Sequence, residues 1–255
     1  MTDQTVSLEQ SEEVATLTLT QPQSLGTNTL TEMLQTLQSL KQNSSIRALI
    51  VTGAKPESLL ADVSKLVPLN PLEALTFSEL GQQVCATLEA LPFPTIAAVD
   101  GLALGGGCEL ITACDLTYAS ERSRFGQIEV LGGIIPGFGG TWRLARRIGA
   151  QRARELIFTG ETIDARQAQQ LGLVLDVVES EKLLAHCQAI AKKIANAAPL
   201  AVSQAKKMLV AGADLSIAAS NLLERQTFAT LFSTSDQKEG MTAFLEQRSP
   251  NFQGR

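Results

Sequence analysis

Apolar and polar residues alternate in some stretches of the chain and recur every three to four positions in others, so both strands and helices are expected. Residues 14–20 alternate apolar side chains with threonine, which is the pattern of a strand with one buried face. Apolar residues repeat at helical spacing between Leu30 and Leu40. The first elements indicated are therefore a strand and then a helix.

The same order of strand and helix recurs along the next part of the chain. Further strands are predicted at 46–52, 95–99, 116–119 and 173–178, and helices at 72–91 and 109–113. A glycine-rich turn is expected at 101–107, and Asp164 with Gln167 resembles a capping box that opens a helix at Ala165. Strands joined by helices at crossover length favour an α/β fold with strands paired at least partly in parallel.

The pattern after Thr141 is mostly helical and ends in a helical tail. The tail is predicted to comprise helices at 182–196, 199–211, 215–232 and 235–247. Each helix is polar on one side and apolar on the other, so the tail is expected to pack on the core or on a neighbouring subunit.

Composition places the chain among ordinary globular proteins. Its 255 residues are 44% hydrophobic, enough for one large domain or one domain with a small appendage. A net charge of −5 and the lack of a basic stretch argue against a nucleic-acid partner. The first residues resemble no export signal and no apolar run is long enough for a membrane span, so a cytoplasmic protein without membrane attachment is expected. The four cysteines show no C-x-x-C spacing and are expected to be reduced.

The chain contains a single histidine, His186, which lies in a late amphipathic helix and is interpreted as part of the scaffold. One histidine excludes a histidine-rich metal centre, and no metal site is expected. Any Ser-His-Asp or Cys-His system would have to use this residue, and no G-x-S-x-G motif is present. If the protein is an enzyme, carboxylates or backbone groups are expected to carry its chemistry.

Two glycine clusters lie at 101–107 and 132–140, and neither fits the G-x-G-x-x-G or Walker A pattern. Gly105 to Gly107 would bring bare N–H groups to the start of the following helix, where unpaired donors and the helix dipole favour an anion or oxyanion. The alternative is a tight strand-to-helix turn in which glycine only permits close packing. The sequence leaves both open.

Glu109 and Glu129 each lie in an otherwise apolar run beside a glycine cluster. A buried carboxylate is costly unless it is paired, so each could belong to a structural salt bridge. Two such acids in similar settings favour general acid–base catalysis instead.

These motifs resemble the signature of the crotonase, or enoyl-CoA hydratase/isomerase, superfamily. The resemblance rests on Ala97-Ala98-Val99-Asp100-Gly101-Leu102-Ala103-Leu104-Gly105-Gly106-Gly107-Cys108-Glu109-Leu110, on Phe125-Gly126-Gln127-Ile128-Glu129 and on Ile135-Pro136-Gly137-Phe138-Gly139-Gly140-Thr141. It implies a spiral of repeated ββα units over residues 1–198 and a helical region at 199–255 for oligomerisation and for covering the acyl-CoA pocket. It also implies a homotrimer or a dimer of trimers.

The resemblance implies an enzyme that adds water in syn fashion to a trans-2-enoyl-CoA to give a 3-hydroxyacyl-CoA, with no cofactor. Glu109 and Glu129 correspond to the two catalytic glutamates. The N–H groups of Ala61 and Gly106 correspond to the oxyanion hole that holds the thioester oxygen, and the N–H of Gly137 to the group that holds the water.

The chain departs from the family pattern where coenzyme A is usually bound. Leu60 occupies a position that is usually glycine, and Ser64 one that is often lysine, with Lys65 adjacent. Phe244 matches a CoA-contacting phenylalanine, while the lysine that usually accompanies it is replaced by glutamine, with Arg248 next to it. Lys65, Phe244 and Arg248 are therefore the candidate CoA contacts.

Other functions within the same superfamily stay open. The chain could isomerise an enoyl-CoA double bond, dehydrate a branched or carrier-protein-bound acyl group, or serve as a catalytically silent subunit. The two glutamates favour hydration, because relatives that only isomerise usually lack the carboxylate at the position of Glu109.

Overall fold

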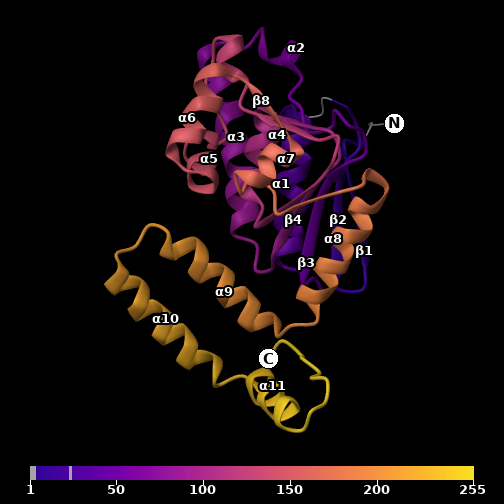
Figure 1. The fold of residues 1–255 in the computed structure, drawn as a ribbon, viewed down its shortest axis with the longest axis vertical. Coiled ribbons are helices and arrows are strands. Elements are labelled where there is room, and N and C mark those ends of the chain that lie inside the picture. The colour runs from indigo at the N-terminus through magenta and orange to yellow at the C-terminus, as the bar shows by residue number, and fades with distance from the viewer. Residues whose placement is uncertain (1–3, 23–24) are drawn as a thin grey trace.

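The computed structural model describes residues 4–22 and 25–255, and a six-stranded sheet lies at its centre (Figure 1). The sheet order is β1-β2-β3-β4-β6-β9, with β1 antiparallel to β2 and all other neighbours parallel. Its strands are β1 (Val6–Ser11), β2 (Val14–Leu19), β3 (Ala48–Gly53), β4 (Thr95–Val99), β6 (Leu116–Ser120) and β9 (Asp176–Val178). The prediction of an α/β fold with parallel pairing is confirmed.

A second, three-stranded sheet was not predicted. It consists of β5 (Leu102–Leu104), β7 (Arg124–Gly126) and β8 (Thr162–Asp164), in the order β5-β7-β8. The stretch 101–107 was predicted to be a turn, and the structure shows instead that its centre pairs in parallel with β7. The strand predicted at 173–178 is shorter than expected, because only its last three residues pair with β6.

The described residues form eleven α-helices and one 3₁₀ turn. They are α1 (Thr27–Lys41), α2 (Val63–Leu66), α3 (Pro71–Glu89), α4 (Gly106–Ala113), η1 (Glu129–Gly132), α5 (Gly140–Ile148), α6 (Ala150–Thr159), α7 (Ala165–Gln170), α8 (Ser180–Ala195), α9 (Pro199–Gly212), α10 (Ile217–Leu231) and α11 (Ser235–Leu245). The predicted capping box at α7 is confirmed by reciprocal hydrogen bonds between Asp164 and Gln167. The helix expected at 109–113 begins three residues earlier, at Gly106.

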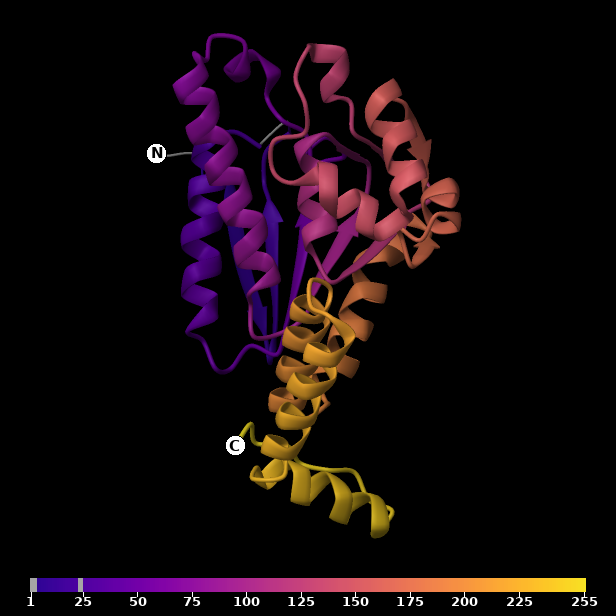
Figure 2. The ribbon, with the colours of Figure 1, turned by 90° about the vertical axis from the view of Figure 1, so that its left-hand side faces the viewer.

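Helices cover both faces of the large sheet because side chains in a strand point alternately to opposite sides. In β3, Ala48 and Ile50 pack in one apolar cluster with α8, while Leu49 and Val51 belong to the main core with α1 and α3. Figure 2 shows α1 and α3 on one side of this sheet. The glycine-rich α4 contributes to the same main core as α3, so the candidate site lies on this side and α8 on the other.

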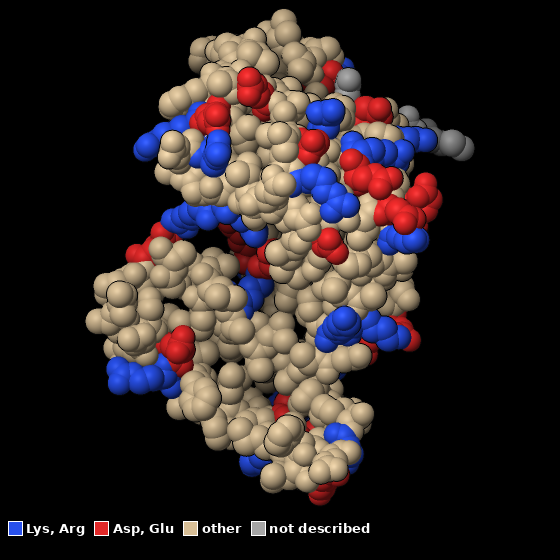
Figure 3. Space-filling view, in the orientation of Figure 1, with Lys and Arg blue, Asp and Glu red and all other residues tan. Residues whose placement is uncertain are grey.

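The chain ends in an arm formed by α9, α10 and α11, which projects away from the core (Figure 2). Lys206 on α9 connects it to the core: its ammonium donates to the carbonyls of Leu88 and Phe93, and lies 2.8 Å from a carboxylate oxygen of Asp115. Figure 3 shows an opening between arm and core. The predicted division at residue 199 coincides with the start of this arm, and its status as a domain boundary stays a prediction.

Across the described ranges 4–22 and 25–255, no helix combines the length and the apolar character that crossing a bilayer requires.

Candidate active site

The first turn of α4 follows β5 directly, and glycine makes this sharp change of direction possible. Gly105 has a positive φ of 54°, which residues with a side chain rarely adopt. Gly106 is the first residue of the helix, so its N–H has no acceptor within the helix. The helix start predicted at these glycines therefore agrees with the structure, but the prediction of bare N–H groups is wrong for Gly105, whose N–H donates to the Gly126 carbonyl at 2.9 Å.

The segment Leu59–Ala61 lies against this helix start. Leu59 forms a parallel bridge with Ala103 of β5, and a Cβ added to Gly107 would overlap the Leu59 carbonyl oxygen. Leu60, in the position that is usually glycine, uses its carbonyl to accept a hydrogen bond from the Leu25 N–H at 3.0 Å. The structure thus brings Ala61 and Gly106, the two candidate oxyanion donors, onto adjacent segments.

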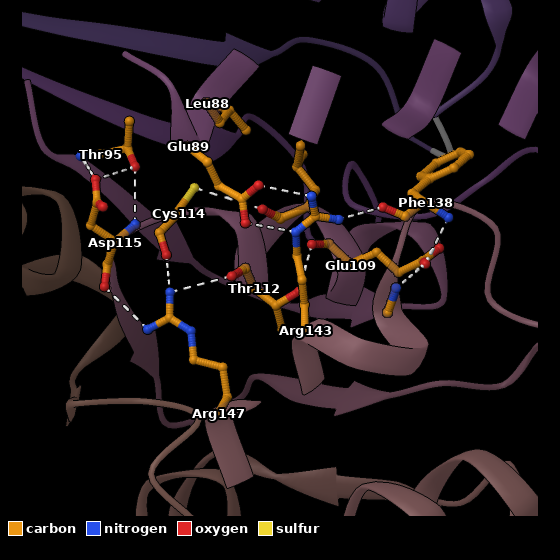
Figure 4. Close-up of polar contacts among 12 residues, drawn as sticks. Leu88, Glu89, Thr95, Glu109, Thr112, Cys114, Asp115, Phe138, Arg143 and Arg147 are labelled. Carbon is orange, nitrogen blue, oxygen red and sulfur yellow. Dashed lines mark hydrogen bonds and ion pairs between the residues drawn. The ribbon is translucent and has the colours of Figure 1, made fainter. Parts of the chain in front are cut away.

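Glu109 lies one turn into α4, where its side chain is almost completely buried. Its Oε1 accepts hydrogen bonds from the N–H groups of Phe138, at 2.7 Å, and Gly140, at 2.6 Å (Figure 4). Burial raises the pKa of Glu109, and these N–H groups, with that of Gly137, counteract the rise by stabilising the charged form. Both of the bonds from Phe138 and Gly140 are donated to the same carboxyl oxygen, Oε1.

Glu129 opens the 3₁₀ turn η1, and its carboxyl group lies over the start of α4. A Cβ added to Gly105 would be 3.1 Å from its Oε1. Burial and, secondly, the negative charge of Glu109 raise its pKa to about 7. The two glutamates therefore share one site, and they differ in their surroundings: backbone N–H groups counteract the rise in the pKa of Glu109, whereas the charge of Glu109 adds to the rise in that of Glu129.

Gln127 is a site residue that the sequence analysis did not identify. It is fully buried, and its amide nitrogen lies 3.1 and 3.2 Å from the two carboxyl oxygens of Glu129 in the orientation that pairs donor with acceptor. Glutamine is rarely buried without a partner. One signal in the sequence could have identified Gln127: it follows the apolar Phe125 and lies two residues before a candidate catalytic glutamate.

The loop between η1 and α5 is fixed to α3 through one carbonyl group. The Gly137 carbonyl accepts hydrogen bonds from Ser78 Oγ, at 2.6 Å, and Gln82 Nε2, at 3.1 Å. Its N–H contributes to lowering the pKa of Glu109. Gly137 therefore lies beside Glu109, where the sequence analysis expected a group that holds the water.

The ring of Phe138 fills the space between α3 and the start of α4. Its centroid is 5.3 Å from that of Phe77, and a Cβ on Gly81 would overlap it. A Cβ on Gly106 would lie 2.8 Å from its Cε2. Phe138 thus forms a wall directly beside a candidate oxyanion donor.

The three candidate CoA contacts do not come together within one chain. Lys65 lies on α2, at the opposite end of the molecule from α11, which carries Phe244 (Figure 1). The Phe244 side chain is 83% exposed. Arg248 already pairs with Glu239 at 2.7 Å and Glu246 at 2.7 Å.

The remaining nucleophiles lie outside the site or are inert. His186 on α8 packs edge-to-face on Tyr118, with ring centroids 4.9 Å apart, on the far face of the large sheet. The four cysteines are free and buried, and burial raises the pKa of Cys108 and Cys114 to about 12. Within the described residues, no group of three or more His, Cys, Asp or Glu side chains could hold a metal ion.

Comparison with known proteins identifies the family. Residues 9–255 match the model of the family described as enoyl-CoA hydratase/isomerase. The chain belongs to this family. It is 43% identical to the short-chain-enoyl-CoA hydratase of Clostridium acetobutylicum over 248 residues, which is 95% of each chain. It is 40% identical to the crotonyl-CoA hydratase of Syntrophomonas wolfei over 257 residues, which is 99% of each.

Solved structures of the family share the fold. The crystal structure of an enoyl-CoA hydratase from Bacillus anthracis superposes with a TM-score of 0.94 and 34% identity, covering 99% of this chain and 100% of that one. One from Geobacillus kaustophilus superposes with a TM-score of 0.91 and 35% identity, covering 98% of each. The predicted family and the predicted crotonase-type α/β fold are therefore confirmed.

Proposed function

We propose that the protein is an enoyl-CoA hydratase that adds water in syn fashion to a trans-2-enoyl-CoA. The observation that carries the proposal is the pair of glutamates at the start of α4. Glu109 is bonded through one oxygen to two backbone N–H groups, and Glu129 beside it has a pKa raised to about 7. In such a pair, one carboxyl group can act as the base and the other as the acid.

The first requirement of the reaction is to stabilise negative charge on the thioester oxygen. Water attacks the β-carbon of the conjugated thioester, and the electrons move onto that oxygen. The N–H groups of Gly106 and Ala61 would donate to it, aided by the positive end of the α4 dipole. One well-placed oxyanion donor contributes about 2.7–4 kcal/mol in a hydrolase studied by mutagenesis, so this pair would carry a large part of the rate enhancement.

The second requirement is the balance of protons. Glu109, as carboxylate, accepts a proton from the attacking water through the oxygen not bonded to Phe138 and Gly140. Glu129, as carboxylic acid, delivers a proton to the α-carbon, and the N–H of Gly137 helps to hold the water. The net result is one water added across the double bond, after which the two carboxyl groups exchange a proton to restore the starting state.

The wall formed by Phe138 favours a short acyl chain. Its ring occupies the volume between α3 and α4 beside the Gly106 N–H, next to which the acyl group would extend. The names of the relatives from C. acetobutylicum and S. wolfei, a short-chain-enoyl-CoA hydratase and a crotonyl-CoA hydratase, support the same choice. We therefore propose crotonyl-CoA as a suitable substrate.

Coenzyme A binding and oligomerisation are proposed together. The arm carries large exposed apolar residues on α10 and α11, among them Ile217, Phe228 and Phe244. In a homotrimer or a dimer of trimers, a second copy would cover these faces. Within one chain, Phe244 and Lys65 lie at opposite ends of the molecule (Figure 1). A neighbouring copy in the oligomer would place its own Phe244 near Lys65 of this chain.

The proposal is tested with purified protein and crotonyl-CoA, by following the loss of absorbance of the conjugated thioester. Hydration should be observed, and mass spectrometry should find product heavier by one water, whereas an isomerase would leave the mass unchanged. E109Q and E129Q should each abolish turnover, while E121Q, at an exposed glutamate in the turn after β6, should not. If none of the short- and medium-chain enoyl-CoA substrates is hydrated, the proposal is refuted.

A further inference from the structure

Arg143 is a buried cation that connects α3 to the loop around Glu109. Only 6% of its side chain is exposed. Its Nε and Nη2 donate to Oε1 and Oε2 of Glu89 on α3, each at 2.8 Å, and its Nη1 donates to the Phe138 carbonyl at 2.6 Å (Figure 4). A planar guanidinium bound at three points has little freedom to move.

The residue that Arg143 holds is the one that orients Glu109. The Phe138 carbonyl accepts from Arg143, while the N–H of the same residue donates to Glu109 Oε1. The second donor, Gly140, lies two residues further on, across Gly139 with its positive φ of 103°. A Cβ on Gly139 would overlap Nη1 of Arg143. The guanidinium therefore lies directly beneath the turn that presents both N–H groups.

The charges around Glu109 give Arg143 a second effect. The titratable groups that interact with Glu109 are Glu129 on η1, Cys85 on α3, Cys108 on α4 and Arg143 on α5. Burial raises the pKa of both thiols, so they are neutral at pH 7. Among the described groups, Arg143 is thus the positive charge that favours ionised Glu109, and Glu89 partly neutralises it.

We propose that Arg143 is a positioning residue for Glu109, oriented in turn by Glu89: its guanidinium fixes the Phe138 peptide, whose N–H binds Glu109 Oε1, and places a positive charge beside that carboxyl group. The proposal rests on the proposed role of Glu109 as the base. It assigns a catalytic consequence to an ion pair between residues 54 positions apart, neither of which reaches the water or the substrate.

The first test separates positioning from simple stabilisation. R143M leaves the half-buried Glu89 carboxylate without its cation, and E89M leaves the buried Arg143 guanidinium without its anion. Each variant should lower the melting temperature, whereas R143M/E89M removes both charges and should regain much of the loss. If Arg143 positions Glu109, kcat for crotonyl-CoA stays on the order of 10²-fold low in R143M and in the double variant, with a smaller change in KM. Recovery of kcat together with stability in the double variant would overturn the proposal.

A matched control is R152M, which removes an arginine of the neighbouring α6 from an exposed pair with Glu155. It should leave kcat unchanged. R143K serves if R143M does not fold: lysine retains the charge but lacks the planar fork that binds both carboxyl oxygens of Glu89 and the Phe138 carbonyl in one fixed geometry. Its kcat should fall while the pKa of Glu109 stays near that of the wild type. Wild-type kcat in R143K would contradict the positioning role.

The second test does not require activity. The Glu109 carboxyl is titrated by ¹³C NMR on glutamate-labelled protein and assigned by its loss in E109Q. Its pKa should rise in R143M, where a positive charge is lost, and fall in E89Q, where a negative charge is lost. A structural disturbance alone would not produce opposite shifts. Unchanged titration in both variants would overturn this proposal, whereas opposite shifts in a protein that does not hydrate crotonyl-CoA would refute the proposed function alone.

Discussion

Replacing Glu129 with glutamine should stabilise the protein, and increasingly so as the pH rises. Burial and the nearby Glu109 raise the pKa of Glu129 from 4.5 to about 7. The folded protein therefore holds the Glu129 proton more tightly than the unfolded chain does. Below pH 4.5 both states are protonated and the group has no effect, but stability is lost as the pH rises from 4.5 through 7.

The magnitude follows from the size of the shift. A rise from 4.5 to about 7 corresponds to about 3 kcal/mol, at about 1.4 kcal/mol per pKa unit. The Gln127 amide donates to the ionised carboxyl group and offsets part of this, so about 3 kcal/mol is an upper value. For a chain of this size it corresponds to an increase in melting temperature of roughly 6–12 °C. Glutamine, which is neutral at every pH, removes the cost.

The assay is urea or thermal unfolding of wild type and E129Q at about pH 4 and about pH 8. E129Q should match the wild type at the lower pH, exceed it in stability at the higher pH, and lack hydratase activity at both. E121Q, at an exposed glutamate, should follow the wild-type profile. An E129Q protein no more stable than the wild type at about pH 8 would refute the raised pKa, and with it the assignment of Glu129 as the acid.

Three further substitutions test the site and the arm. In G107A the new methyl group would overlap the Leu59 carbonyl and displace the Ala61 segment, so kcat should fall on the order of 10²-fold. The control is G212A, in which the added Cβ meets only Ser220 Oγ at 3.8 Å and kcat should not change. In F138L the smaller side chain should raise kcat/KM for hexenoyl-CoA relative to crotonyl-CoA; an unchanged ratio would show that Phe138 does not limit chain length. K206M leaves the Asp115 carboxylate without its cation, so it should lower the free energy of unfolding by about 3 kcal/mol and speed hydrogen exchange in α9. Unchanged exchange would mean that Lys206 does not hold the arm against the core.

Strands buried on both faces were predictable because such burial requires a nearly continuous run of apolar residues. β3 and β4 are almost continuously apolar and were located within two residues at each end. β1 was missed because it is an edge strand in which only Val6 is buried, so no apolar pattern marks it. β5, β7 and β8 were missed because three residues are too few to show a period. Their pairing depends on segments distant in sequence.

The candidate site was predictable in its residue types but not in its contacts. Glycine is required where α4 begins close to Leu59, and the glutamates stand out in apolar runs, so the sequence alone identified both. The partners of Glu109 lie 29 and 31 residues further along the chain and are backbone groups, which carry no side-chain signal. The roles of Arg143 and Gln127 were hidden for the same reason, since each depends on a neighbour brought close only by folding.

The sequence by itself thus determined the family, the α/β class and the two acids, because burial patterns, helix starts and a glutamate in an apolar run are local properties. Only the tertiary structure shows how the surroundings of the two acids differ. Glu109 and Glu129 occupy equally apolar stretches, and they differ because the fold directs two N–H groups and the charge of Arg143 toward Glu109 and leaves Glu129 buried beside a negative charge. Protonation depends on the surroundings in space, and those are set by the packing of α3, α4 and α5.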